Sequence, residues 1–307
     1  MPWILIFEQL LNGVQLGLTL FLMAAGLTLV LGIMNLVNLA HGSLYMVGAY
    51  FAATFTALTG CFLAGIALAL GATLLVGMAV EVIAMRRLYG RDHLDHVLGT
   101  FGLILFFNEL VRLVWGPAGK TLPLPSWLNR SIEILPGVPY SMYRLSIIVV
   151  ALAVALGLYV VIMRTRFGML VRAGASNREM VGALGINIRL LYTFVFGVGA
   201  ALAGLAGMMQ AAILTAQIGM GENFLILAFV VIIIGGIGSI RGAFVAALFV
   251  GFVDTVGRTF LPELLKLVLS ATAASTAAPA LSSMLIYLLM AAVLVVRPAG
   301  LFPAATR

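Results

Sequence analysis

The sequence predicts an all-α integral membrane protein, a polytopic bundle of about 8–10 transmembrane helices, some of them broken. The first observation behind this prediction is composition, because 63% of the 307 residues are hydrophobic and only 9% are charged. Soluble domains carry about 25% charged residues. The second is a mean hydropathy of +1.19, which implies more apolar surface than a soluble core of this size could bury. The third is that the charges gather in short segments between long apolar runs.

A spanning helix needs about 20 mainly apolar residues, and nine runs approach this length within a single domain that covers residues 1–307. The expected spans lie near residues 8–31, 35–58, 61–83, 97–115, 143–163, 189–213, 223–238, 241–259 and 281–296. The run at 35–58 begins with polar residues, and glycines interrupt 223–259, so broken helices are expected there. The first run lacks the basic start of a signal peptide, and we interpret it as a retained span.

The arginines predict the orientation, because loops rich in Arg and Lys lie on the cytoplasmic side of a membrane. Segment 84–96 carries three arginines and segment 164–189 carries five. Both are expected in the cytoplasm, which places the proline-rich loop 116–142 outside and the C-terminus inside. The same alternation puts the N-terminus outside with nine spans and inside with ten.

Other classes of function find little support. The net charge of +7 follows from arginines that face anionic lipid, so no nucleic acid is expected as a partner. The single cysteine, Cys61, excludes an internal disulfide, and we interpret it as a small core residue. His41 is too isolated to predict a metal site. Gly119-Lys120-Thr121 resembles the end of a phosphate-binding loop, but Val114 stands where that motif needs glycine. The chain is therefore not expected to be an enzyme or to hydrolyse ATP.

A polar cluster opens the second apolar run, and its members are Asn35, Asn38, His41, Ser43 and Tyr45. In lipid each unsatisfied polar group costs several kcal/mol, so these side chains must face protein, water or the interface. One interpretation is a satisfied loop in which Asn38 or Ser43 caps the next helix. The other is a broken helix that lines or gates a translocation path, because irregular backbone persists at depth only beside a cavity.

The second interruption consists of glycines at Gly235, Gly236, Gly238 and Gly242. Glycine permits left-handed backbone and ends helices. A nucleotide-binding loop would need a preceding strand, and none is expected here. We therefore predict a tight turn or hinge between two spans.

Further patterns concern helix packing and ion pairs. Small residues recur at four-residue spacing in the pairs Gly13–Gly17, Ala200–Gly204 and Ala203–Gly207, which predicts close approach of helix backbones. Acids in or near spans are Glu81, Glu109 beside Arg112, and Asp254 beside Arg258. Charges inside a membrane mark function by default, but these spacings place each of the two pairs on one helix face. Neutralised structural pairs are an equally good interpretation.

The second arginine-rich segment is longer than a connection requires. From Gly168 to Leu184 it predicts a short amphipathic helix that is closed by Gly185 at the C-cap position. One interpretation is a solvated loop whose arginines only determine topology. The other is a docking helix for a cytosolic partner, anchored by Met180, Val181 and Leu184 with arginines around them.

Four parts of the chain, taken in order, resemble the membrane permeases of branched-chain amino acid ABC importers. They are Asn35-Leu-Val-Asn-Leu-Ala-His-Gly-Ser43 with Tyr45 and Gly48-Ala-Tyr50, Arg172-Ala with Ala183-Leu-Gly-Ile-Asn187, Gly235-Gly-Ile-Gly-Ser-Ile240 with Gly242-Ala, and Arg297-Pro-Ala-Gly-Leu-Phe302. They extend over nearly the whole chain. The first part and the length resemble the shorter of the two paired permease subunits.

The resemblance implies a division of labour in a bacterial inner membrane. A second, similar permease would complete the path, a periplasmic solute-binding protein would deliver the cargo, and two cytosolic ATPase subunits would use ATP and magnesium. This chain would bind no cofactor itself. Contact with the ATPase would be made by a coupling helix through Arg172, Glu179, Leu184, Gly185 and Asn187. Branched-chain or other hydrophobic amino acids are the expected cargo, with urea, amides and aromatic or other carboxylic acids as alternatives in the wider family.

Two rival functions remain to be weighed. A self-contained secondary transporter or channel needs ion ligands in the broken helices of two repeats. The polar cluster and the glycine break are a candidate pair, but no deep unpaired carboxylate accompanies them. An intramembrane enzyme needs a metal or acid–base set, which the sequence does not offer.

Overall fold

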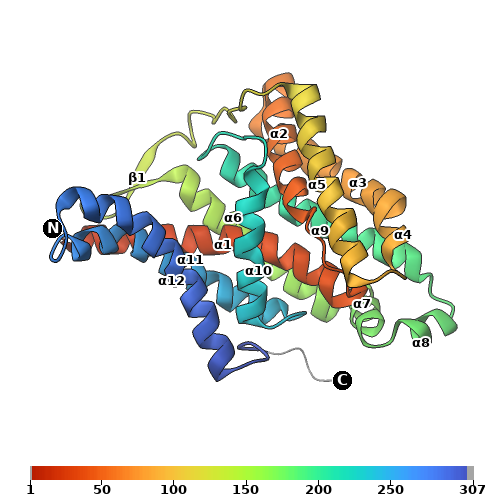
Figure 1. Cartoon of the computed structure of the whole chain (residues 1–307). Coiled ribbons are helices and arrows are strands. Elements are labelled where there is room, and N and C mark those ends of the chain that lie inside the picture. Colours follow the sequence, from red (N-terminus) through yellow and green to blue (C-terminus); the bar gives the residue numbers. More distant parts are fainter. Residues whose placement is uncertain (1, 303–307) are drawn as a thin grey trace.

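The structure, a computed structural model, describes residues 2–302 and is built almost entirely of helices (Figure 1). In this part of the chain nine helices are long: α1 (Pro2–Met34), α2 (His41–Thr59), α3 (Phe62–Val80), α5 (His93–Trp115), α6 (Met142–Arg164), α9 (Ile188–Ala211), α10 (Met220–Gly235), α11 (Ile240–Leu265) and α12 (Ala271–Val296). Short elements connect them: the π-helix η1 (Glu81–Met85), α4 (Arg86–Leu88), α7 (Arg166–Ser176), α8 (Arg178–Ala183), and the antiparallel hairpin of β1 (Ser131–Leu135) and β2 (Val138–Ser141).

Among the residues that the structure describes, seven helical segments are long and apolar enough to cross a membrane, which confirms the predicted multi-pass fold. They are α1, α5, α6, α9, α11, α12 and the continuous segment Phe62–Leu88 that α3, η1 and α4 form. The other two long helices are α2, with 19 residues, and α10, with 16 residues. These are the two runs for which the sequence predicted breaks, so both remain in the bundle as shortened helices.

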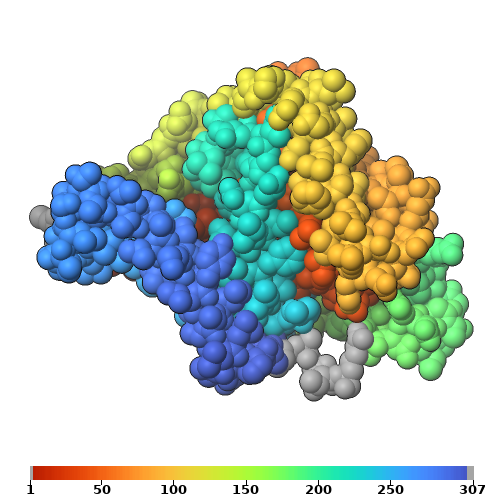
Figure 2. Space-filling view, viewed as in Figure 1, coloured from red at the N-terminus to blue at the C-terminus, as the bar shows by residue number. Residues whose placement is uncertain are grey.

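The bundle has an inner and an outer layer. In the most hydrophobic stretch of each helix, 83% of the residues of α1 and α9 are buried, against 11% in α12. Figure 2 shows α5, α10 and α12 across the face turned toward the reader, with only small parts of the first 50 residues visible between them. The outer helices therefore present their apolar faces to lipid, while α1, α2 and α9 pack against protein.

Glycine lets the inner helices approach one another closely. An ideal Cβ on Gly17 of α1 would lie 2.7 Å from the carbonyl oxygen of Ala247 on α11, and one on Gly48 of α2 would collide with Gly204 of α9. Because no side chain separates these backbones, the helices pack by direct van der Waals contact. The predicted contact positions Gly17 and Gly204 are thereby confirmed as places where helices meet.

The arginine-rich segments gather at one end of the bundle, which we call the basic end: residues 86–91, 164–189, 235–241 and 297–302. The other end carries the loop 116–142, whose Lys120 pairs with Ala216 in an isolated β-bridge. The first part of α1 lies toward this other end, because Arg144 at the start of α6 donates a 2.6 Å hydrogen bond to Asn12. Successive long helices run in alternating directions between the two ends.

After α1 the chain turns back into the bundle. Residues 35–40 are not helical, and α2 begins only at His41. The His41 ring lies against Gly26, about two turns before the end of α1, since an ideal Cβ on that glycine would be 3.0 Å from Nε2. Irregular backbone is tolerated at such depth because protein surrounds it. Leu36, Asn38 and Ala40 are no more than 1% exposed.

Two expectations about individual segments are corrected by the structure. Cys61 is exposed in the connection between α2 and α3 and is not a core residue. The last helix begins at Ala271, well before the expected 281, because Pro279 is accommodated inside it. A run of small residues such as 271–280 has too little apolar surface to stand out as a span by hydropathy, although alanine favours helix.

Candidate functional site

The predicted path residues lie in the re-entrant segment and the start of α2. Asn38, His41, Ser43 and Tyr45 are buried, whereas Asn35 is exposed at the basic end with a φ of +53°. The N-cap of α2 is Ala40, and no side chain caps the helix. The interpretation in which Asn38 or Ser43 caps this helix is therefore wrong.

Several polar atoms of this segment are buried without a hydrogen-bond partner among the described residues. They are the amide atoms of Asn38, both ring nitrogens of His41 and the hydroxyl of Tyr45. The Tyr45 ring stacks on Phe224 of α10 with centroids 4.9 Å apart. Buried polar groups without partners are costly, so the polar atoms of this segment are not satisfied by the surrounding protein.

The glycine-rich segment forms a tight turn between α10 and α11. Gly236 and Gly238 have φ values of +102° and +82°, which only glycine adopts easily. The Ser239 hydroxyl caps α11 by accepting a 3.1 Å hydrogen bond from the amide of Gly242. An ideal Cβ on Gly242 would collide with the backbone of Gly235. The glycines are thus required by a turn in which the two helix ends touch.

The C-terminal segment docks on this turn. The amide of Leu301 donates to the carbonyl of Ile234 over 2.8 Å, and the amide of Phe302 donates to that of Gly235 over 3.0 Å. These two carbonyls end α10 and have no partner within that helix. Gly300 has a φ of +80° and lies against Gly236. The last two parts of the family resemblance therefore form one structural unit at the basic end.

The second arginine-rich segment forms two helices and not the single helix expected from Gly168 to Leu184. Asn177 separates α7 from α8, and its side chain accepts a 2.9 Å hydrogen bond from the amide of Met180. Asparagine is a strong N-cap, so it ends one helix and starts the next. Gly185 follows α8 with a φ of +84°, which confirms the C-cap prediction. The amide of Ile186 donates back to Val181.

The tip of α8 stands out from the bundle at the lower right of Figure 1. Leu184 is 73% exposed and Met180 is 59% exposed. Val181 is buried, so it anchors α8 to its own chain and does not belong to the free apolar surface. Asn187 caps α9 by accepting a 3.1 Å hydrogen bond from the amide of Leu190. All five residues of the predicted coupling set, Arg172, Glu179, Leu184, Gly185 and Asn187, are exposed, and Met180 adds a further exposed apolar side chain beside Leu184.

Arg172 lies apart from this tip. It is on α7, and its guanidinium donates to the carbonyl oxygen of Ile162 near the end of α6. The structure therefore divides the predicted coupling residues between two places. Glu179 lies on the protruding α8, and Leu184 and Gly185 directly follow it, whereas Arg172 lies in the middle of α7.

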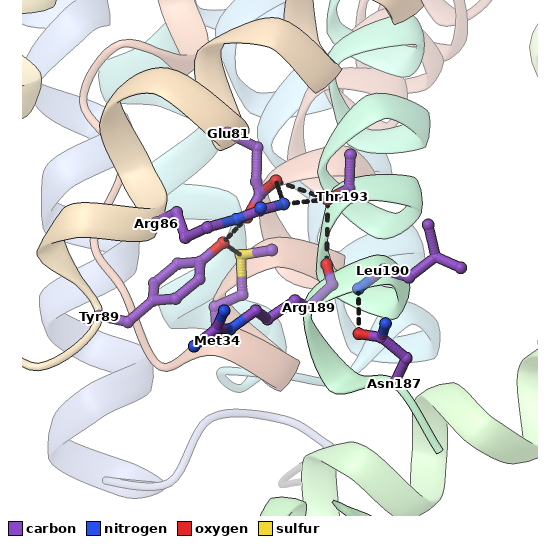
Figure 3. A network of polar contacts seen from close by, with 8 residues as sticks. All are labelled: Met34, Glu81, Arg86, Tyr89, Asn187, Arg189, Leu190 and Thr193. Atoms are coloured by element: carbon purple, nitrogen blue, oxygen red, sulfur yellow. Dashed lines mark hydrogen bonds and ion pairs between the residues drawn. The ribbon is translucent and has the colours of Figure 1, made fainter. Parts of the chain in front are cut away.

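A polar network that the sequence did not predict joins η1, α4 and α9 (Figure 3). The carboxylate of Glu81 is fully buried and accepts hydrogen bonds from Arg86 at 3.0 Å, Tyr89 at 2.5 Å and Thr193 at 2.6 Å. Burial, followed by the hydrogen bond to Glu81, raises the pKa of the Tyr89 phenol well above its usual value. The phenol therefore stays a hydrogen-bond donor to the carboxylate. Only the acid stood out in the sequence, as an isolated charge at the end of a span.

The two predicted ion pairs are present and differ in exposure. Glu109 and Arg112 lie 3.4 Å apart with both side chains exposed, so they add little stability. Asp254 accepts a 2.8 Å hydrogen bond from Arg258, and the aspartate is buried. Between residues 2 and 302 no group of three or more His, Cys, Asp or Glu side chains is placed to hold a metal ion.

These features define a polytopic membrane protein whose irregular and basic segments converge at one end of a helical bundle. The chain belongs to the family of permease components of branched-chain amino acid transport systems, whose profile matches residues 9–294. The resemblance noted in the sequence is thereby confirmed.

Individual relatives match over most of their length. The chain is 34% identical over 264 residues to the high-affinity branched-chain amino acid transport system permease protein BraD of Pseudomonas aeruginosa, covering 81% of this chain and 85% of that protein. It is 31% identical over 278 residues to the permease protein LivH of Escherichia coli, covering 86% and 89%. A probable branched-chain amino acid permease of Methanocaldococcus jannaschii is 26% identical over 244 residues, covering 77% and 76%. No solved structure matches.

Proposed function

We propose that this chain is the permease subunit of an ATP-driven importer of branched-chain amino acids in a bacterial inner membrane, with its C-terminus in the cytoplasm. A second permease subunit completes the path, and a periplasmic binding protein supplies the cargo. Two cytosolic ATPase subunits use ATP and magnesium, so this chain needs no cofactor. The proposal is supported by the family and by the names of relatives such as BraD, which are transport permeases for these amino acids.

The observation that carries the coupling proposal is the apolar tip of α8 at the basic end. Leu184 and Met180 are exposed beside Glu179 and several arginines. An apolar centre with a charged rim is the usual form of a protein contact. In the proposal, α8 enters a groove of the ATPase, Gly185 and Asn187 hold α8 against α9, and Arg172 holds the base of α7 against α6.

The buried polar segment 38–45 is proposed to border the translocation path. Its polar atoms find no partners among the described residues. Tyr45 stacks on α10, and the start of α10 lies beside the start of α2, since Gly221 contacts Gly42. A shift of α10 against α2 would open these groups to cargo and water, while the glycine turn 235–242 serves as the hinge.

The test is transport by the reconstituted complex, with leucine uptake and ATP hydrolysis measured on the same proteoliposomes. Leu184→Asp is expected to lower uptake at least tenfold, because the charge would be buried in the ATPase groove. Leu214→Asp is the matched control, since Leu214 is 51% exposed at the other end of the bundle. Undiminished uptake with Leu184→Asp would overturn the coupling proposal.

A second experiment tests whether transport is driven by ATP. Uptake is expected to need ATP and the ATPase subunits. Uptake by the chain alone, without ATP, would establish the secondary transporter instead.

A further inference from the structure

Two adjoining cavities beside α7 are lined by no residue of α8 or of the buried segment 38–45, although Asn35 lines the second of them. One has a volume of about 340 Å³ and is lined only by apolar side chains and one glycine, from α1, α6, α7 and α9. The other, of about 700 Å³, opens at the basic end between α1, α7 and the glycine turn. Leu29, Ile162 and Val171 line both, so the two lie side by side, and we call them together the recess.

The recess is apolar inside and basic at its mouth. Its apolar part extends from Ile162 back to Val154 along α6, a length of about 12 Å along the helix axis. Arg172 lines the mouth, and Arg164 and Arg166 flank the α6–α7 junction there. An amphiphile with an apolar tail and an anionic head matches this distribution.

The polar groups at the mouth have unused hydrogen-bonding capacity. A guanidinium has five N–H donors, and Arg172 uses one on the carbonyl of Ile162. Thr28 also lines the mouth, and its hydroxyl is buried without a hydrogen-bond partner among the described residues. A phosphate accepts two parallel hydrogen bonds from one arginine, and an ester oxygen of a glycerol backbone would suit the Thr28 hydroxyl.

The charges decide between two kinds of ligand. An amino acid carries an ammonium group as well as a carboxylate, yet the lining residues of both cavities include no Asp or Glu within the described part of the chain. Its ammonium would be desolvated without a counter-charge, which is costly. A phospholipid with a net negative head brings no such cation. Basic pockets between membrane helices commonly hold anionic lipid heads.

We propose that this recess is a binding site for one anionic phospholipid, with an acyl chain along α6 in the apolar part and the phosphate at Arg172. The lipid would hold α7, and through it the base of the α7–α8 segment, against α1 and α6.

The glycine at position 157 supplies a test of the acyl-chain part. Gly157 lines the apolar cavity, and a Cβ placed on it meets no atom within 4 Å. Gly157→Leu therefore fills the cavity without colliding with the protein. Gly102 on α5 also has open space around it, so Gly102→Leu is a matched control with the same change on another helix.

The experiment uses the full chain, purified in detergent and stripped of lipid, and native mass spectrometry to count bound lipid during titration. Phosphatidylglycerol is expected to bind at least tenfold more tightly than phosphatidylcholine. Gly157→Leu should weaken phosphatidylglycerol binding at least tenfold, while Gly102→Leu leaves it within twofold. Arg172→Gln should remove the preference for phosphatidylglycerol.

Competition experiments distinguish a bound lipid from the other possible ligands. Glycerol phosphate, which has the head but no chain, is expected not to displace the lipid at millimolar concentration. Displacement by glycerol phosphate together with an unaffected Gly157→Leu variant would mean a simple anion site and overturn the proposal. Displacement by leucine would mean a cargo site, and equal binding of the two lipids would mean a lipid-facing surface without a site; either result would also overturn it.

Discussion

The hydroxyl of Thr193 lies 2.6 Å from Oε2 of Glu81 and joins α9 to the π-helical end of α3. The carboxylate is fully buried and is balanced by Arg86, with which it forms a 3.0 Å ion pair. The carbonyl oxygen of Arg189 lies 3.0 Å from the same hydroxyl. Because Arg189 lies in the first turn of α9, these contacts tie the start of α9 to Arg86 in the first arginine-rich segment.

The first prediction concerns the energy of this network. Thr193→Val should destabilise the protein by about 1.5–3 kcal/mol, the range for a hydrogen bond to a charged group. Arg86→Met should cost more, about 3–5 kcal/mol, because it leaves a buried carboxylate without its counter-charge. The measurement is thermal unfolding of the purified chain in detergent. Thr276→Val is the control, since that exposed hydroxyl bonds only to its own helix. Equal melting of the Thr193 and Thr276 variants would refute the role of the network.

The second prediction concerns the glycine turn. Gly242→Val should prevent the ends of α10 and α11 from touching, because its Cβ would collide with the backbone of Gly235, which cannot rotate away. Overpacking of this kind costs about 1–3 kcal/mol or more. The yield of monodisperse protein in gel filtration should fall. Gly71→Val, at a helical glycine with open space, should leave the yield near that of the parent, and a similar loss there would point to a general effect of valine.

The third prediction concerns the end of α8. Gly185→Ala should loosen the segment 178–187, because a non-glycine residue with positive φ costs about 1–2 kcal/mol. Amide hydrogen exchange followed by mass spectrometry should become faster in this segment and unchanged in α1. Gly182→Ala is the neighbouring control. A Cβ added to Gly182 would have its nearest atom, on Ile188, 3.8 Å away, which is an ordinary van der Waals contact. Unchanged exchange in the Gly185 variant would mean that the cap does not hold α8.

The fourth prediction concerns orientation, for which Cys61 is a natural probe. It is the single cysteine of the chain and is exposed between α2 and α3, away from the basic end. A membrane-impermeant maleimide should label it in right-side-out vesicles and not in sealed inverted vesicles. In a Cys61→Ser background, Met180→Cys should show the opposite pattern. Labelling of Cys61 only in inverted vesicles would reverse the proposed orientation.

Local patterns in the sequence were enough to predict those features of the molecule that depend only on residues close together in the chain. The glycines at 235–242 and Gly185 were predicted as a turn and a cap, because positive φ is a property of a single residue. The single helix from Gly168 to Leu184 was wrong, because the Asn177 side chain bonds to the backbone and caps α8, a role that asparagine takes more readily than a place inside a helix. The roles of the predicted path and coupling residues stay predictions.

By itself the sequence determined that lipid is the solvent, where the long apolar runs lie and which segments gather at the basic end. These properties follow from summed hydropathy and charge, which need no knowledge of contacts. Only the tertiary structure decided that the chain re-enters the bundle at 35–40, that Glu81 meets Thr193 across 112 positions of sequence, and that Phe302 docks on the glycine turn. Such contacts arise where distant helices are brought together, and no periodicity along one segment encodes its partner.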